Sequence, residues 1–152
     1  MAEFSKEINS KFPNEKIKAL LNVKFTANYF DTIGNTFLKP FKISEQQYNI
    51  LRILRGAKEA ITVKTVKERM VQKSPNSTRL MDKLCDKNLI KRERSEHDRR
   101  VVYVKITEKG LDLLSEIKME GLDNYFNNIS EDEAKILNTL LDKFRGNGNK
   151  NI

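Results

Sequence analysis

The stretch Leu84–Gly110, LCDKNLIKRERSEHDRRVVYVKITEKG, carries most of the information about the fold of this chain. Its pattern predicts the end of a helix, a short strand, a charged turn, a second strand of alternating apolar residues and the start of a new helix. This succession predicts a wing, a β-hairpin that presents arginines at its tip directly after a helix of the size that enters a DNA groove. Hairpins of this kind lie on the sugar-phosphate backbone or reach into the minor groove.

A long helix is predicted for Glu15–Leu38, well upstream of the wing. Its apolar residues recur at every fourth position from Ile17 to Phe37, which is the spacing of one helix face. Pro40 follows and ends the helix. Residues 1–14 are polar, and we expect them to be flexible.

Two shorter helices follow, and each begins at a capping residue. Ser44–Gln47 has the pattern of a capping box, and the apolar residues after it predict a helix that Gly56 ends. Thr62 is placed to cap a short helix that reaches Met70.

The helix before the wing is predicted to begin at Ser74-Pro75, an N-cap followed by proline at the first helical position. It runs to about Lys87, and Asn88 tolerates the left-handed conformation that stops a helix. Two strands then follow, at about Ile90–Arg94 and Arg100–Ile106. The second strand alternates apolar residues in the way expected for a hairpin with one buried face.

Two helices are predicted after the wing. Thr107 caps a long helix that extends to about Asn127, and Ser130–Glu133 is a second capping box that opens a last helix to about Arg145. No order is expected for the tail, residues 146–152.

The fold class is therefore mainly α with a small β-hairpin: a winged helix-turn-helix core flanked by N- and C-terminal dimerisation helices. Terminal helices with apolar stripes need another surface on which to bury them, and a second copy of the chain is the simplest partner that provides one. The predicted parts are a flexible N-terminus (1–14), an N-terminal dimerisation helix (15–43), a winged DNA-binding lobe (44–106), C-terminal dimerisation helices (107–145) and a disordered tail (146–152).

Positive charge is concentrated in the middle third of the chain. The 152 residues include 29 Lys and Arg against 21 Asp and Glu, a net charge of +8. Residues 62–105 carry 13 basic and 6 acidic residues, a net charge of +7, whereas residues 106–152 carry 6 and 9, a net charge of −3. A localised basic surface is typical of a polyanion-binding protein, although charge alone also fits a well-solvated basic domain.

Several classes of protein and site are excluded by composition. The single cysteine, Cys85, rules out an internal disulfide framework and points to a reducing compartment. One cysteine and one histidine, His97, cannot build the usual zinc site. There is no secretory signal or membrane-length apolar run, so we expect a cytoplasmic protein. No nucleophile–base pair, glycine-rich phosphate loop or apolar carboxylate pair is found, so neither catalysis nor a cofactor or metal is expected.

The helix before the wing has the residues of a DNA-reading helix on its outer face. Arginine can pair bidentately with guanine, asparagine with adenine, and hydroxyl groups with phosphate. Arg79 is the best candidate for a base contact, although an ordinary solvated face remains an alternative. The candidates on this helix are Ser74, Asn76, Thr78, Arg79 and Lys83.

The wing turn combines arginines with acids. The candidate residues are Arg94, Asp98, Arg99 and Arg100. A plain phosphate clamp would not need carboxylates, but a carboxylate beside an arginine can hold its guanidinium in one orientation. We therefore expect Asp98 to orient Arg100, against the alternative of a surface ion pair of negligible energy.

These residues resemble a known family. Asp98-Arg99-Arg100 followed by Ile106–Gly110 resembles the D-x-R … [LI]-T-x-x-G signature of MarR-type (multiple antibiotic resistance regulator) transcriptional regulators. The likeness continues upstream through Ser77–Leu84, Lys87–Ile90 and Ser44–Leu51, and it covers about residues 16–145. One departure is Asn88, where glycine is common, and Asn suits the same left-handed turn.

The resemblance implies a homodimer whose terminal helices interlock and whose two lobes meet successive major grooves of a pseudo-palindromic site. It also implies that Arg100 enters the minor groove while Asp98 braces it. In this family an effector pocket borders the dimer body, which makes Phe25, Asn28 and Tyr29 candidate ligand contacts. The alternative is plain core, which is the more frequent role of an aromatic stripe at helical spacing. The expected function is a sequence-specific, ligand-relieved repressor, and the alternative is a winged-helix module that binds an acidic protein.

Overall fold

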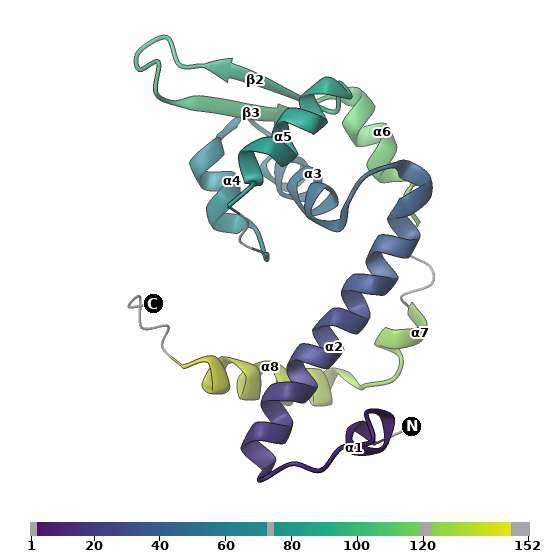
Figure 1. The fold of residues 1–152 in the computed structure, drawn as a ribbon. Coiled ribbons are helices and arrows are strands. Elements are labelled where there is room, and N and C mark those ends of the chain that lie inside the picture. Colours follow the sequence, from purple (N-terminus) through teal and green to yellow (C-terminus); the bar gives the residue numbers. More distant parts are fainter. Residues whose placement is uncertain (1–2, 73–74, 119–122, 147–152) are drawn as a thin grey trace. The chain divides into compact units, whose positions relative to one another are not determined.

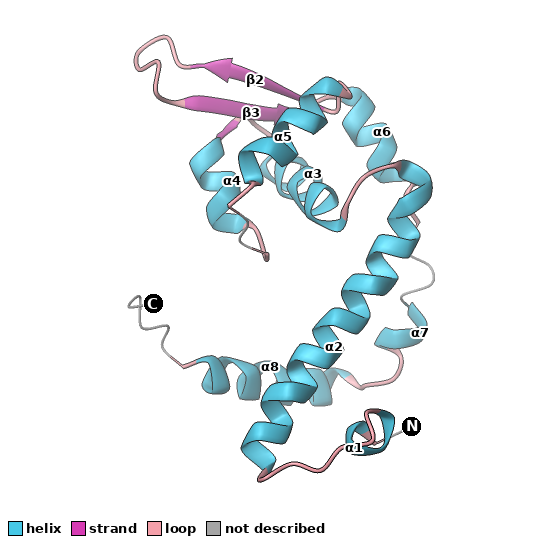
Figure 2. Ribbon diagram, viewed as in Figure 1, coloured by secondary structure: helices cyan, strands magenta, loops and turns pink. Residues whose placement is uncertain are grey.

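The computed structural model describes residues 3–72, 75–118 and 123–146. The chain is largely helical with one small antiparallel sheet (Figures 1 and 2), which confirms the predicted fold class. It divides into two compact units, residues 1–117 and residues 118–152. Among the described residues, no helix combines the length and the apolar character needed to cross a membrane.

The long helix α2 spans Glu15–Leu38, as predicted. The side chain of Asn14 accepts a hydrogen bond from the backbone N–H of Ile17 at 3.0 Å and so caps its first turn. At the other end Pro40 lies in a short 3-10 turn, η1 (Lys39–Phe41), because proline cannot donate the hydrogen bond that would continue the helix.

The segment before α2 differs from the flexible N-terminus that was predicted. A one-turn helix, α1 (Phe4–Glu7), buries the ring of Phe4, which lies 5.3 Å from the ring of Phe12 and 5.3 Å from that of Phe25. The polar composition hid this order, because two aromatic residues eight positions apart form no helical or strand-like pattern in the sequence.

Helices α3 and α4 begin at the predicted caps. Helix α3 spans Glu45–Ala57 behind a complete capping box, and α4 spans Val63–Arg69 behind Thr62. The predicted stop at Gly56 is wrong by two residues, because Gly56 is helical and Lys58 takes the left-handed conformation, with φ of 60°. Glycine is not needed at this stop, because an exposed lysine adopts the left-handed turn instead.

The sheet has three strands in the order β1-β3-β2. Strands β2 (Ile90–Arg94) and β3 (Val102–Ile106) form the predicted hairpin, which projects beyond the helices of its unit (Figure 2). The additional strand β1 (Ile61–Thr62) pairs Ile61 with Val104 and was not predicted. Two residues are too short to show alternation, so only the pairing with β3 defines this strand.

The core of the first unit lies where α3, α4, α5 (Ser77–Asp86) and β3 meet. The apolar faces predicted for these elements supply it, since each buries its periodic residues against the others. The largest fully buried side chains are Leu38, Ile50, Leu51, Leu54, Val66, Met81, Leu84 and Val104.

The helix after the wing is shorter than predicted. Helix α6 spans Glu108–Glu116, and the backbone leaves the helical conformation at Ile117, with ψ of 93°. The side chain of Ile117 is buried, so a tertiary contact replaces the next helical turn. The remainder of the predicted helix falls partly on residues 119–122, which lie outside the described residues.

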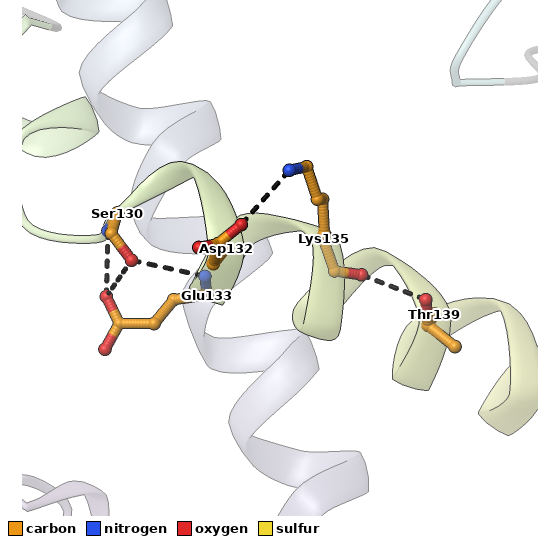
Figure 3. A network of polar contacts seen from close by, with 5 residues as sticks. All are labelled: Ser130, Asp132, Glu133, Lys135 and Thr139. Atoms are coloured by element: carbon orange, nitrogen blue, oxygen red, sulfur yellow. Dashed lines mark hydrogen bonds and ion pairs between the residues drawn. The ribbon is translucent and has the colours of Figure 1, made fainter.

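The second unit contains α7 (Asp123–Phe126) and α8 (Glu131–Arg145). Figure 3 shows the cap of α8, in which Ser130 accepts from the backbone of Glu133 at 3.3 Å while the Glu133 carboxylate accepts from the backbone of Ser130 at 2.8 Å. The pKa of Glu133 is lowered because its charged form accepts hydrogen bonds from the backbone and hydroxyl of Ser130. This confirms the second predicted capping box.

Helices α2 and α8 both expose apolar residues. On α2 these include Ile17, Leu20, Leu21, Val23, Phe25, Tyr29 and Phe30, and on α8 they include Ile136, Leu137, Leu140 and Phe144. Single exposed apolar residues are ordinary, but a row along one helix indicates a surface that binds another protein.

Candidate nucleic-acid interface

The helix predicted to read DNA is α5, which begins at Ser77 with Asn76 as its N-cap residue. The predicted start at Ser74-Pro75 is therefore too early: Pro75 lies in the turn before the helix, and Ser74 lies outside the described residues. Proline has the same restricted φ in a turn as at the first position of a helix. The presence of Pro75 therefore did not distinguish between these two positions.

Helix α5 has one buried face and one exposed face, and the residues predicted for its outer face lie on the exposed one. Ser77, Met81 and Leu84 are buried against the core. The other face is open to solvent, and it carries the candidate residues Asn76, Thr78, Arg79 and Lys83 together with Asp82. The structure thus brings four of the five predicted reading residues together on one exposed surface, and the fifth, Ser74, lies outside the described residues.

Helix α5 is also held by a contact that the sequence analysis missed. Gln47, the third residue of the α3 capping box, is buried, and its side-chain amide donates a hydrogen bond to the carbonyl of Leu80 at 3.4 Å. The same side chain accepts from the backbone of Ser44 at 3.0 Å. One glutamine therefore both caps α3 and ties it to α5. The capping box was visible in the sequence, but the bond to Leu80 joins residues 33 positions apart and has no local signal.

The turn of the wing is closed by short-range hydrogen bonds. The hydroxyl of Ser95 accepts from the backbone of His97 at 3.2 Å and of Asp98 at 3.3 Å, and the backbone of Ser95 donates to the carbonyl of Val101 at 3.0 Å. Serine commonly organises turns in this way. Ser95 was not among the predicted site residues, although its position before the acidic turn fits this motif.

Asp98 braces the wing differently from the prediction. Its carboxylate accepts a hydrogen bond from the backbone N–H of Arg100 at 2.9 Å, and its carbonyl accepts from the backbone of Val101 at 2.9 Å. Within the described part of the chain it makes no ion pair with the guanidinium of Arg100. Asp98 therefore shapes the turn that carries Arg100, and it leaves the guanidinium free to meet another group.

Arg92 forms the joint between the wing and α5. Its guanidinium donates to the carboxylate of Asp82 and to the carbonyl of Thr78, the latter at 3.1 Å. Its Nε is buried without a hydrogen-bond partner. Planar guanidinium groups suit such two-point contacts, so Arg92 holds the wing against the reading helix.

The remaining wing candidates stay exposed. Arg94 is the last residue of β2 and pairs with Val102, while Arg99 and Arg100 lie in the turn that follows. The structure thus sets three exposed arginines on the end of a hairpin that Ser95 and Asp98 hold in shape.

The candidate effector residues do not enclose a site within one chain. Phe25, Asn28 and Tyr29 are all exposed on α2. The ring of Phe25 packs against Phe4, and that of Tyr29 contacts Phe30 edge-on at 5.8 Å. Phe25 and Tyr29 are part of the exposed apolar row of α2, and Asn28 is a polar residue between them. Packing against Phe4 accounts for Phe25.

A polar cavity lies elsewhere, between the end of α2 and the start of α3. It has a volume of about 220 Å³ and is lined by Asp31, Asn35, Ser44, Glu45, Gln46 and Gln72. The amide of Gln72 donates to Asp31 at 3.0 Å, whereas one carboxylate oxygen of Glu45 is buried without a partner. Burial first, and the charge of Asp31 second, raise the pKa of Glu45.

Cys85 is half-buried on the flank of α5. Burial is the main cause that raises the pKa of its thiol, and it outweighs the lowering effect of Arg92. A raised pKa reduces the thiolate fraction, so the structure favours a packing role for this cysteine.

An exposed polar helix set beside an arginine-tipped hairpin defines a winged helix-turn-helix. The family model for the SarA/Rot transcriptional regulators matches residues 32–117 of this chain. The transcriptional regulator MgrA of Staphylococcus aureus is 31% identical over 112 residues, which cover 72% of this chain and 75% of that protein.

Solved structures agree with this match. A mutant MarR from E. coli, in complex with operator DNA, is 27% identical with a TM-score of 0.74, over 88% of this chain and 98% of that one. A MarR transcription factor from Planctomyces limnophilus is 30% identical with a TM-score of 0.65, over 86% of this chain and 96% of that one.

The chain belongs to the SarA/Rot family of transcriptional regulators, whose fold is the MarR-like winged helix. It is accordingly a DNA-binding regulator of transcription and not an enzyme, in agreement with the sequence analysis.

Proposed function

We propose that the protein is a cytoplasmic homodimeric repressor that binds a pseudo-palindromic operator and is released by a small-molecule effector. The observation that carries the proposal is the adjacency of two exposed elements: the polar face of α5 and the braced wing that ends in Arg100. Arg92 joins the two elements, so they meet DNA as one surface.

In this proposal α5 enters the major groove. Arg79 contacts a base edge, because arginine pairs bidentately with guanine O6 and N7. Asn76 and Thr78 lie at the start of the helix, where short polar side chains reach bases or phosphate, and Lys83 lies one turn further on, where it neutralises phosphate. Ser74 belongs to the same expected contact region.

The wing supplies the second contact. Arg100 enters the minor groove from the turn that Asp98 braces, and Arg94 and Arg99 contact the phosphates on either side. A narrow minor groove has an enhanced negative potential that attracts arginine. The free guanidinium of Arg100 suits this role, because it is not already paired with Asp98.

Dimerisation follows from the exposed apolar rows of α2 and α8, which a second copy of the chain would bury. Two lobes related by a two-fold axis fit half-sites about one helical turn apart, roughly 34–36 Å. An effector that binds more tightly to a dimer with a different spacing of the lobes shifts the population towards that form, and the affinity for DNA falls as a result. Phe25, Asn28 and Tyr29 are candidates for its contacts at the dimer body.

The test is selection of bound sequences from a pool of random duplexes, followed by affinity measurements on the selected site. We expect a pseudo-palindrome with half-sites about one turn apart. Arg100→Ala should weaken binding by about 1–3 kcal/mol, whereas Arg55→Ala removes the same charge from an exposed position of α3 and should have little effect. Equal affinities of the two variants for the selected duplex would show that Arg100 of the wing does not contact DNA.

A further inference from the structure

The segment that connects α4 to α5 contains Gln72, to which neither the predicted sites nor the family match assigns a role. The side chain of Gln72 is half-buried, whereas its apolar neighbour Val71 is 86% exposed. Burial of apolar surface favours the opposite arrangement, with the valine inside and the glutamine in water. The polar contacts of Gln72 therefore account for the conformation of this segment.

The side-chain amide of Gln72 bridges two helices. Its N–H donates to the carboxylate of Asp31 on α2 at 3.0 Å, and its carbonyl oxygen accepts from the amide of Gln46 on α3 at 3.2 Å. A carboxylate only accepts hydrogen bonds, so the N–H side of the Gln72 amide must face Asp31. The backbone N–H of Val71 also donates to the side chain of Asn49 on α3, at 3.2 Å. These bonds fasten the segment before α5 to both α2 and α3.

The bond from Gln72 to Asp31 connects parts of the chain that are distant in sequence. The two residues are 41 positions apart, and both are half-buried. Hydrogen bonds to a charged acceptor are roughly twice as strong as those between neutral groups. This bond therefore resists a rotation that would carry the start of α5 away from α2.

The bridge borders the polar cavity of about 220 Å³, which Asp31, Gln46 and Gln72 help to line. Glu45 also lines this cavity, and its carboxylate lies against α2 at Gly34, where an added Cβ would be 3.0 Å from it. Side chains beside a cavity lack packing partners on that side. Hydrogen bonds, more than close packing, therefore hold the segment before α5 to α2 at this place.

The effect of the bridge on DNA binding rests on the proposed function, in which α2 joins two copies of the chain and α5 of each copy enters a major groove. The distance between the two α5 helices must then match half-sites roughly 34–36 Å apart. A contact that fixes the start of α5 on α2 also fixes this distance.

We infer that Gln72 is a positioning residue for operator binding. Its bridge between Asp31 and Gln46 holds the DNA-binding lobe at one angle on α2, and it thereby sets the half-site spacing that the dimer accepts. Gln72 acts through the placement of α5 and does not read a base itself. Its loss leaves the reading surface of each lobe intact.

Three variants test the bridge, and Val71→Ala is the matched control. Gln72→Glu places a carboxylate against that of Asp31 and breaks the bond, because neither group can donate. Asp31→Asn alone keeps an oxygen that accepts from Gln72. The double variant Asp31→Asn/Gln72→Glu exchanges donor and acceptor, restores the bond and keeps the wild-type net charge. Val71→Ala changes the adjacent exposed side chain, whereas the bond to Asn49 uses the backbone of Val71.

The measurement compares three duplexes: the selected operator, the same operator with its half-sites moved apart by about two base pairs, and a single half-site. The wild type must break the bridge to fit the wrong spacing, whereas Gln72→Glu need not. We expect the preference of Gln72→Glu for the native spacing to be about ten-fold smaller than that of the wild type, which corresponds to one hydrogen bond to a charged group. Asp31→Asn, the double variant and Val71→Ala should keep the wild-type preference.

The single half-site separates positioning from a structural role, because binding to it does not depend on the distance between lobes. Its affinity for Gln72→Glu should change far less than the spacing preference does. Equal losses on the half-site and on the full operator would mean that Gln72 only supports the fold of the lobe, and they would overturn the inference.

Two further results would also overturn the inference: an unchanged spacing preference in Gln72→Glu, and failure of the double variant to restore that preference. Failure of the proposed function has a different signature. If the wild type binds both spacings equally, the proposed dimeric operator binding fails together with the role of Gln72. If the wild type prefers one spacing and Gln72→Glu shares that preference in full, the proposed function stands and only the role of Gln72 fails.

Discussion

Gly110 shows how a single residue is required by close packing. A Cβ added at this position would lie 2.4 Å from the carbonyl oxygen of Leu89 and 2.7 Å from a side-chain carbon of Ile106. Its backbone N–H also donates to the hydroxyl of Thr107 at 3.1 Å, and that hydroxyl donates to the carbonyl of Asn88 at 2.8 Å. The start of α6 is thereby held against Asn88 and Leu89, the two residues directly before the first strand of the wing.

We predict that Gly110→Ala lowers the free energy of unfolding by about 1–3 kcal/mol, because a backbone carbonyl cannot move aside. Gly56→Ala is the matched control. Gly56 lies inside α3 with no atom within 4 Å of an added Cβ, so alanine there should stabilise the protein by about 0.5–1 kcal/mol. Urea denaturation measures both, and a destabilised Gly56→Ala would contradict this account.

Glu45 shows the effect of a desolvated charge. Its pKa is raised by burial and by Asp31, so the folded state holds the proton more tightly than the unfolded state does. Its ionised form therefore costs stability above the raised pKa, and this cost disappears as the pH falls through that pKa. Asp31 and Glu45 are the titratable groups that line the cavity.

We predict that Glu45→Gln raises the melting temperature at neutral pH, and that this gain shrinks in acid as wild-type Glu45 becomes protonated. Thermal unfolding across a pH series measures the effect. Glu59→Gln, at an exposed position outside the cavity, should show no such pH-dependent gain. A gain for Glu45→Gln that is constant with pH would mean that the charge is not its cause.

Among the elements, the wing is a hairpin whose tip is organised by hydrogen bonds from backbone N–H groups to the side chains of Ser95 and Asp98 and to two backbone carbonyls. The first strand has the predicted bounds, whereas the second begins at Val102 and not at Arg100, because Arg100 belongs to the turn. Alternation over five residues and a charged turn are local signals, so the hairpin itself was predicted. The role of Asp98 was placed on the wrong atoms of Arg100, because a sequence does not distinguish a bond to a backbone N–H from one to a guanidinium.

The corrected role of Asp98 gives a prediction that separates the two mechanisms. Asp98→Asn keeps an oxygen that accepts from the backbone of Arg100, so it should retain most of the affinity for DNA. Asp98→Ala loses the bond and should weaken binding by about 1 kcal/mol, roughly five-fold. Fluorescence anisotropy on the selected operator measures both. Similar losses for Asn and Ala would favour orientation of the guanidinium by charge.

The helix boundaries also differ in how far the sequence predicts them: local patterns predict the starts, and tertiary contacts set one of the ends. The caps at Ser44, Thr62, Thr107 and Ser130 lie where their local patterns placed them, because each cap depends on residues within one turn. The end of α6 at Ile117 was not predicted, since it depends on burial against residues distant in the sequence.

At the scale of the whole molecule, α8 has the clearest unpartnered face. Ile136, Leu140 and Phe144 recur every fourth residue and are 60%, 56% and 50% exposed. This spacing sets them in one row on the helix. The proposed dimer would bury that row together with the apolar residues of α2.

We predict that Leu140→Asp converts the dimer into monomers, because a charge at the centre of the row cannot be buried unpaired. Affinity for the operator should fall by about 100-fold or more, since two linked lobes become two independent ones. Sedimentation and operator binding measure these effects. Asn138→Asp adds the same charge at an exposed polar position of α8 and should remain dimeric. Wild-type monomers at micromolar concentration would contradict the dimer.

The amino-acid sequence was enough to predict the winged helix-turn-helix order, the principal caps, the outer face of α5 and the arginines of the wing. These features depend on helical or strand periodicity and on hydrogen bonds within a few residues, which a linear pattern records. Four features became visible only in the folded chain: the packing of Phe4, the pairing of β1, the bonds of Arg92 to Asp82 and Thr78, and the polar cavity between α2 and α3. Each joins residues separated along the chain, and such contacts exist only once the core has brought their elements together.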